Sequence, residues 1–176
     1  ELKINEVVDY LTRIPYSENI ECTENQYNEL LSIAEFNSRA RIGSIAKNIS
    51  GTTIFGESFD LYSIDNDFTI VYFWSYTCDH CRENIKDLKI FLDDNPDCSL
   101  VAVSVKGDLK KIKSLVKKTK LNGYFYHDGL EWNCPFVDDY AVTGTPSFYL
   151  LDKEKKIVYK PFDFNELVDF VKIIKQ

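Results

Sequence analysis

The chain of 176 residues contains no methionine, only seven glycines and no apolar run of the roughly 18 residues that a membrane-spanning helix needs. Without a methionine it lacks its own start residue, so we expect a processed or shortened form of a longer product. The glycines nowhere form a phosphate-binding loop, so neither a nucleotide nor a flavin is indicated and we expect no cofactor.

Positive charge is also scarce, with 21 Lys and Arg against 28 Asp and Glu and a net charge of −7. No basic block is interleaved with aromatic residues, so we do not expect nucleic acid or an anionic membrane surface as a partner. In contrast, 44% of the residues are hydrophobic and 14% are aromatic. This content is sufficient for a sizeable core, so we expect one domain, or one domain with an appendage.

The most informative motif is Cys78-Asp79-His80-Cys81, which stands between a strand-like run at 69–74 and a helix-like run. Two cysteines with this spacing can form a reversible disulfide. Cys78 is expected at the helix N-terminus, where free N–H groups and the helix dipole favour a thiolate. A thiolate attacks a disulfide in another molecule, and the second cysteine resolves the mixed disulfide. The sequence therefore predicts a thiol–disulfide oxidoreductase.

The two central residues of the motif act on the Cys78 thiolate in opposite directions. A protonated His80 stabilises the thiolate and makes the disulfide more oxidising, whereas the carboxylate of Asp79 opposes it. Each charge at about 4 Å in water is worth roughly 1 kcal/mol, so their sum has no defined sign. The sequence therefore leaves open whether the protein oxidises or reduces its partners.

The second motif is Thr145-Pro146, directly before the β-rich run at 147–151. A proline at the start of a strand cannot extend the ladder on its N–H side, and it can hold a cis bond. Only about 5–6% of X-Pro bonds are cis, so this dipeptide alone favours an ordinary trans proline. Beside a dithiol, a cis-proline would leave backbone groups free for an extended substrate and keep metal-chelating side chains away.

Hydrophobic periodicity divides the chain into two parts. Helical spacing and a capping box, Thr23 with Gln26, predict a helical N-terminal extension over residues 1–41. From residue 42 onward strands and helices alternate. We expect a hairpin between 49 and 68, strands at 69–75, 99–105, 124–127, 147–151 and 156–160, and helices at 79–93, after Asp108, from Pro135 to Tyr140 and after a cap at Asn165. This order predicts an α/β fold in which helices flank a mixed central sheet.

The two motifs together resemble the thioredoxin superfamily. The pattern Trp74-x3-Cys78-x2-Cys81 follows an apolar strand, and Gly144-Thr145-Pro146-Ser147-Phe148 stands downstream. Within the superfamily the chain is most similar to the TlpA/ResA-like thiol–disulfide oxidoreductases of bacterial envelopes, which are related to AhpC/TSA-type proteins. The segments Ile42-Gly43-Ser44-Ile45-Ala46 and Phe59-Asp60-Leu61 resemble that branch. The resemblance covers about residues 42–176 and implies a thioredoxin-like fold with a helix–strand insertion.

The resemblance also implies roles and a setting. Cys78 would attack and Cys81 would resolve. The neighbouring residues would shape the groove (Thr145, Pro146), tune the potential (Asp79, His80) and support the site (Trp74). The implied partners are protein substrates that carry thiols or disulfides, with a membrane thiol reductase as electron donor. The implied location is the bacterial periplasm or cell envelope, although cysteine usage leaves the cytoplasm open, and the oligomeric state is not indicated.

Two departures from the family pattern concern the proton of Cys81. Thioredoxins carry a buried acid two residues before the family tryptophan, where this chain has Tyr72. TlpA/ResA-like proteins often carry an acid three residues after the second cysteine, where this chain has Asn84. A water molecule or Glu83 is left as the acceptor.

Three other interpretations remain open. A peroxiredoxin would need a proline where Val71 stands, although Ser75 could fill its hydroxyl position. A zinc site is suggested by the CxxC spacing, but the other candidate ligands are scattered along the sequence (Cys98, Cys134, His127). We expect the three cysteines outside the CxxC motif, Cys22 among them, to be inert packing residues. The third interpretation is a thioredoxin-fold interaction module with little turnover.

Overall fold

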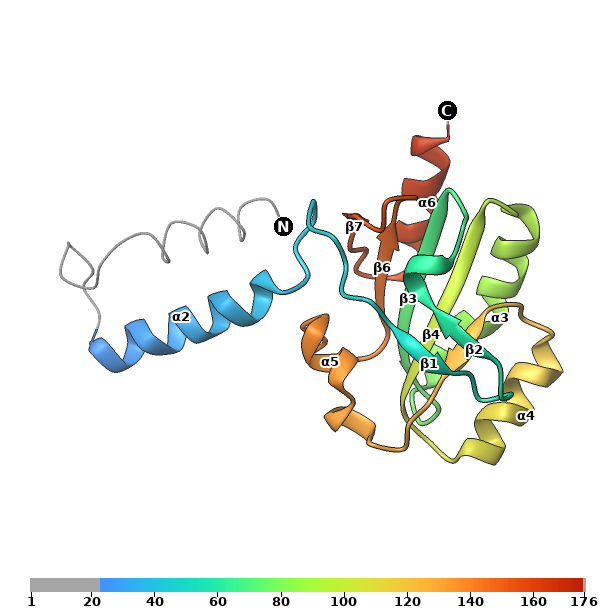
Figure 1. Ribbon diagram of the computed structural model, residues 1–176, viewed down its shortest axis with the longest axis horizontal. Helices are drawn as coiled ribbons and strands as arrows, with labels where there is room; N and C mark the ends of the chain where they lie inside the picture. Colours follow the sequence, from blue (N-terminus) through green and yellow to red (C-terminus); the bar gives the residue numbers. More distant parts are fainter. Residues whose placement is uncertain (1–22, 176) are drawn as a thin grey trace.

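The computed structural model describes residues 23–175, and Figure 1 shows how their helices and strands are arranged. Within this range the chain forms a five-stranded mixed sheet with the strand order β5-β4-β3-β6-β7, together with a separate hairpin, β1-β2. The strands are β1 (Ser50–Thr52), β2 (Ser58–Asp60), β3 (Phe68–Ser75), β4 (Cys98–Lys106), β5 (Tyr124–Tyr126), β6 (Ser147–Leu151) and β7 (Ile157–Tyr159). The central strand β3 is parallel to β4 and antiparallel to β6.

The helices cover the two faces of this sheet unequally. They are α2 (Glu24–Ser38), α3 (Asp79–Asp94), α4 (Leu109–Thr119), α5 (Pro135–Asp139) and α6 (Phe164–Ile174), with short 3-10 helices at Leu61–Ser63 and Glu131–Asn133. Buried side chains of α3, α4 and α6 join one hydrophobic cluster, and those of α5 and the hairpin join the other. The chain therefore has two cores, one on each face of the sheet.

Strand β3 contributes to both cores. Its residues Tyr72 and Trp74 belong to the cluster of α3, whereas Val71 and Phe73 belong to the cluster of α5. A run of β-branched and aromatic residues without polar alternation is typical of a central strand that is covered on both faces. The predicted α/β fold with a mixed central sheet is confirmed.

The described part of the N-terminal segment is α2, which begins with the predicted capping box. The hydroxyl of Thr23 accepts a hydrogen bond from the Gln26 backbone N–H, and the Gln26 side chain accepts one from the Thr23 N–H. In Figure 1, α2 lies to the side of the sheet, and an ion pair joins Arg39 at its end to Asp138 of α5. The division at residue 41/42 stays a prediction, and the predicted helical stripe before residue 23 lies outside the described residues.

No helix within residues 23–175 combines the length and the apolar character that crossing a membrane requires. Most predicted elements agree with the structure to within one or two residues. The cap of the last helix is an exception, because α6 begins after Asp163 rather than after Asn165. Asp163 has the extended backbone of a cap, and its side chain accepts the Glu166 N–H at 2.9 Å. Asn165 already lies within the first helical turn, so its side chain cannot cap it.

The carboxyl ends of β3 and β4 meet beside the CxxC motif. The N–H of Tyr76 donates to the Lys106 carbonyl at 2.8 Å, which holds the loop after β3 against β4. The residue directly after β4 is Gly107, with φ +141°, and a Cβ built there would lie 2.5 Å from the Cβ of Tyr76. Only glycine allows the two backbones to approach this closely.

We expect Gly107→Ala to lower the free energy of unfolding by about 2 kcal/mol, because the methyl group overlaps Tyr76 and the backbone angle disfavours a side chain. Chemical denaturation measures the loss. Gly129→Ala is the matched control, since its φ is also positive, +77°, but nothing lies within 4 Å of the added carbon. Equal losses in both variants would contradict the close approach of Tyr76.

Candidate active site

The site lies where β3 turns into α3. Cys78 is the N-cap of α3, and its Sγ accepts the backbone N–H of Cys81 at 3.2 Å. The two cysteines are joined by a disulfide, with their Cα atoms 5.2 Å apart. Cys78 is partly exposed, whereas Cys81 is 0% exposed. The accessible sulfur therefore stands at the helix N-terminus and the buried one a single turn further in.

This position favours the negative form of Cys78. An N-cap is normally an oxygen-bearing side chain that accepts an unpaired N–H of the first turn. Here a sulfur takes that place, and in the reduced protein the same N–H can stabilise a thiolate. Cys81 belongs to the cluster that also holds Ile85 and Leu88, so solvent and substrates have little access to it.

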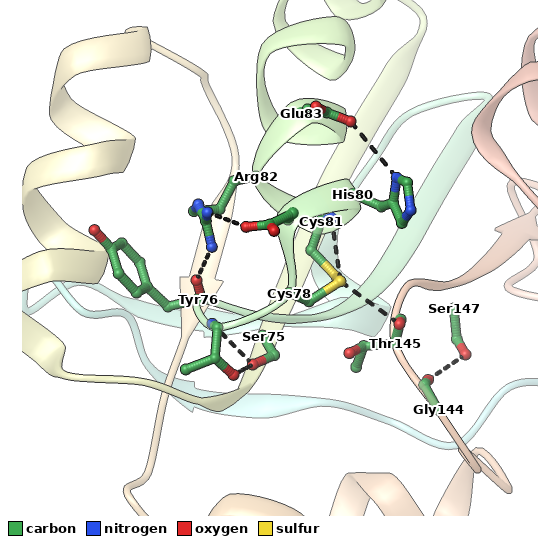
Figure 2. Close-up of a disulfide and its surroundings, with 12 residues drawn as sticks. Ser75, Tyr76, Cys78, His80, Cys81, Arg82, Glu83, Gly144, Thr145 and Ser147 are labelled. Carbon is green, nitrogen blue, oxygen red and sulfur yellow. Dashed lines mark hydrogen bonds and ion pairs between the residues drawn. A yellow bond between two sulfur atoms is a disulfide. The ribbon is translucent and has the colours of Figure 1, made fainter.

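The Thr145-Pro146 dipeptide lies directly beside Cys78, as Figure 2 shows for Thr145. The Cys78 Sγ is 3.6 Å from the Thr145 carbonyl oxygen, and the peptide bond between Thr145 and Pro146 is cis. Antiparallel pairing of β3 with β6 sets this arrangement, since Phe73 is opposite Ser147. The structure thus brings together two motifs that are far apart in the sequence.

Hydroxyl groups hold the loop before Cys78. The Oγ of Ser75 lies 2.8 Å from the Oγ1 of Thr77 and accepts the Thr77 backbone N–H at 3.1 Å. The Cys78 N–H donates to the Ser75 carbonyl at 3.2 Å. Sequence reasoning considered Ser75 only as a peroxiredoxin hydroxyl and missed this role. The Ser-x-Thr pattern at a strand end was the available signal, because such side chains commonly bond the nearby backbone.

The residues between the cysteines point into solvent. The His80 side chain is 86% exposed, and its Nδ1 lies 3.6 Å from a carboxylate oxygen of Glu83, which is itself 68% exposed. Glu83 therefore faces the surface, whereas the sulfur of Cys81 faces the core. The suggestion that Glu83 accepts the proton of Cys81 is wrong, because residues two positions apart on a helix point in different directions.

Tyr72 and Asn84 occupy the two positions at which the family resemblance leads us to expect an acid, and they contact one another. The Tyr72 hydroxyl donates to the Cys81 carbonyl at 3.0 Å. Burial raises the pKa of Tyr72 far above the usual tyrosine value, and a hydrogen bond with the Asn84 side chain offsets part of this rise. Tyr72 thus stays protonated and acts as a hydrogen-bond donor rather than a base.

Three aromatic rings form a stack behind the helix. Trp74 is fully buried, and its ring lies nearly parallel to that of Tyr72 at a centroid distance of 6.5 Å. The Tyr72 ring stacks in turn on Phe148 of β6 at 4.5 Å. These contacts link the strand before Cys78 to the strand after Pro146, and the supporting role of Trp74 stays a prediction.

Arg82 is a site residue that sequence reasoning missed. Its Nη1 donates to the Tyr76 carbonyl at 2.7 Å, and its Nη2 pairs with the carboxylate of Asp79. Its guanidinium also lies 5.7 Å from the centroid of the Tyr76 ring. The spacing of Asp79 and Arg82, three residues apart on a helix, was the available signal.

The other described cysteines lie apart from the dithiol. Cys98 and Cys134 are free and buried. Burial raises the pKa of Cys98 to about 11 and that of Cys134 to about 12, so both remain protonated thiols. His127 bonds its Nδ1 to the Ser104 carbonyl at 3.0 Å. In the part of the chain that the structure describes, no three His, Cys, Asp or Glu residues are grouped to hold a metal ion.

Comparison with known proteins places these features in a wider group. A family model described as thioredoxin-like matches residues 66–157. The fold is similar to the thioredoxin domain of a thiol-disulfide oxidoreductase from Bacteroides vulgatus, with a TM-score of 0.68 and 23% identity over 77% of this chain and 99% of that one. A thioredoxin-like protein from Bacteroides caccae has a TM-score of 0.72 and 20% identity, covering 96% of this chain and 61% of that one.

Among curated proteins, the chain is similar to the soluble secreted antigen MPT53 of Mycobacterium tuberculosis, with 26% identity over 108 residues. The match covers 56% of this chain and 62% of that protein, so the chain spans less than two thirds of the relative's length. The family match takes in just over half of the chain and contains Cys78, Cys81 and the Thr145-Pro146 dipeptide. With an oxidoreductase-like fold around a disulfide-bonded CxxC pair, this chain belongs to the thioredoxin-like family.

Proposed function

We propose that the protein is a thiol–disulfide oxidoreductase that exchanges disulfides with protein substrates through Cys78 and Cys81. One observation carries the proposal. The partly exposed sulfur of Cys78 accepts an N–H at the start of α3, is bonded to a buried cysteine, and lies 3.6 Å from the Thr145 carbonyl oxygen. A nucleophile, a resolving group and a backbone acceptor for substrate thus converge at one point.

In the reducing direction the reaction has two steps. The Cys78 thiolate attacks one sulfur of a substrate disulfide, which forms a mixed disulfide and releases the other substrate sulfur as a thiolate. Cys81 then loses its proton and attacks the Cys78 sulfur, which forms the internal disulfide and frees the second substrate sulfur. Two electrons pass from the dithiol to the substrate, and a thiol donor must return them.

We further propose that the protein is a TlpA/ResA-like reductase in a bacterial periplasm or cell envelope, where a membrane thiol reductase supplies the electrons. Thr145 and Pro146 would line the substrate groove, while Asp79 and His80 would tune the potential. The word "secreted" in the name of the MPT53 relative supports an extracytoplasmic setting.

A second candidate function is a thioredoxin-fold interaction module with little turnover. The pairing of Tyr72 with Asn84 favours it, because neither residue offers a carboxylate to take the proton of Cys81. This candidate and the enzyme differ in the rate at which a mixed disulfide is resolved.

We expect the protein to reduce insulin with a dithiol donor, and we expect Cys78→Ala to abolish this activity because no other described thiol is accessible. Cys81→Ala should instead accumulate a mixed disulfide with the substrate, visible on a non-reducing gel, because the resolving group is missing. Equal insulin reduction by the parent and by Cys78→Ala would end the catalytic hypothesis.

The direction of electron flow can be measured by equilibration with glutathione. For a reductase we expect a potential close to that of thioredoxin, about −270 mV. A value close to about −120 mV, typical of a strong oxidant, would contradict the proposed direction while leaving the exchange chemistry intact.

We expect Asn84→Asp to speed the resolving step by about tenfold or more, because it restores a carboxylate one turn after Cys81, and general acid–base groups contribute roughly 10²–10⁴-fold. Stopped-flow measurement of the decay of a mixed disulfide gives the rate. Asn84→Gln keeps an amide and is the control. No difference between the two variants would mean that proton transfer from Cys81 does not limit turnover.

A further inference from the structure

We propose that Arg82 is a positioning residue that keeps the Cys78 thiolate stable by neutralising Asp79 and by fixing the loop before the helix. The inference rests on the proposed function only in that Cys78 is taken as the attacking sulfur. It follows from the contacts, exposure and charges of the first turn of α3.

Arg82 spans the segment that carries Cys78. Arg82 reaches back along α3 and forms two polar contacts, one with the Tyr76 carbonyl and one with the Asp79 carboxylate. These two residues stand on either side of Cys78 in the sequence. Tyr76 is the first residue after β3, and Asp79 is the first residue of α3. The guanidinium therefore bridges the two ends of the segment that carries the reactive sulfur, as Figure 2 shows for Arg82 and Tyr76.

The charges of the first turn of α3 are paired. Asp79 is adjacent to Cys78, so its carboxylate opposes a second negative charge on the sulfur. Arg82 pairs with this carboxylate, and His80 pairs with Glu83 on the opposite side of the same turn (Figure 2). The acidic and basic side chains of the turn thus form two pairs, Asp79 with Arg82 and His80 with Glu83. Loss of Arg82 would leave the Asp79 charge uncompensated next to the thiolate.

The shape of the arginine side chain suits these two contacts. A guanidinium is a planar fork whose separate N–H groups can serve a carbonyl and a carboxylate at once, whereas a lysine is a single point of charge. Tyr76 is also held from behind, where its N–H bonds to the Lys106 carbonyl and its Cβ lies against Gly107. The loop between β3 and α3 is therefore held by Arg82 on one side and by β4 on the other.

The charge of Arg82 acts on the redox potential through the Cys78 thiolate. Removal of the Arg82 charge destabilises the thiolate, raises the pKa of the Cys78 thiol and makes the reduced protein less stable relative to the disulfide. The protein becomes a weaker oxidant, with a more negative potential. Removal of the Asp79 charge has the opposite effect, and the two changes should largely cancel in the double variant.

The test is a double-mutant cycle of Arg82→Gln and Asp79→Asn, read out as the glutathione redox equilibrium. For a partly exposed ion pair we expect Arg82→Gln to change the equilibrium constant by about threefold, which corresponds to a shift of about 14 mV to more negative potential. Asp79→Asn should shift it by a similar amount in the positive direction, and Arg82→Lys should fall between Arg82→Gln and the parent.

A second readout is the pH dependence of alkylation of Cys78 in a Cys81→Ala background, followed on the Cys78 peptide by mass spectrometry. The pH at which the alkylation rate is half-maximal should be higher in the Arg82→Gln variant than in the parent. Lys89→Gln is the matched control, because it breaks the Lys89–Asp93 ion pair further along the same helix. We expect it to change neither readout.

Two outcomes would overturn the inference. One is an Arg82→Gln variant that behaves like Lys89→Gln, and the other is a double variant whose potential stays as negative as that of Arg82→Gln alone. The potential is an equilibrium property and is measured whether or not the protein turns over. Failure of insulin reduction would therefore contradict the proposed function, and an absent potential shift would contradict the role of Arg82.

Discussion

The hydrogen bond from the Cys81 N–H to the Cys78 sulfur is the interaction on which the site depends. It exists because β3 ends and α3 begins within three residues, so that a sulfur occupies the place of an N-cap oxygen. At this place the reactive atom gains a donor and the favourable end of a helix dipole without any buried cation. The nearby contacts of the fold keep this strand–helix turn in one conformation.

The sheet provides that rigidity through a core on each face. Alternate residues of β3 enter different clusters, so the strand can neither shift its register nor rotate without exposing apolar side chains on both faces. The stack of Trp74, Tyr72 and Phe148 carries the constraint across to β6. As a result the Thr145 carbonyl is held beside Cys78 by packing several residues away from either sulfur.

The sequence predicted the parts of this arrangement that depend on local pattern. The dithiol, its strand and helix, and the Thr23 and Asp108 caps follow from periodicity and from residues close together in the chain. The errors concern choices that only tertiary geometry decides. Asp163 and Asn165 are both good cap residues, and the backbone of Asp163 selects it. Glu83 lies near Cys81 in sequence, but the helix turns it toward His80, and the pairing of Arg82 with the Tyr76 carbonyl has no local sequence signal.

The presence of Tyr72 and Asn84, where a buried acid is expected from the family resemblance, has a physical consequence for the reaction. A carboxylate under the helix would be costly to bury, whereas a neutral hydroxyl–amide pair satisfies its own hydrogen bonds and still supports the Cys81 carbonyl. With Glu83 turned toward the surface, a water molecule or a group of the substrate is left to take the proton of Cys81. The first step of exchange releases a substrate thiolate beside the site, and with an ordinary pKa of about 8.5 this thiolate is a competent base for Cys81. The sulfur released in the first step would then serve as the base for the second, without a carboxylate buried under the helix.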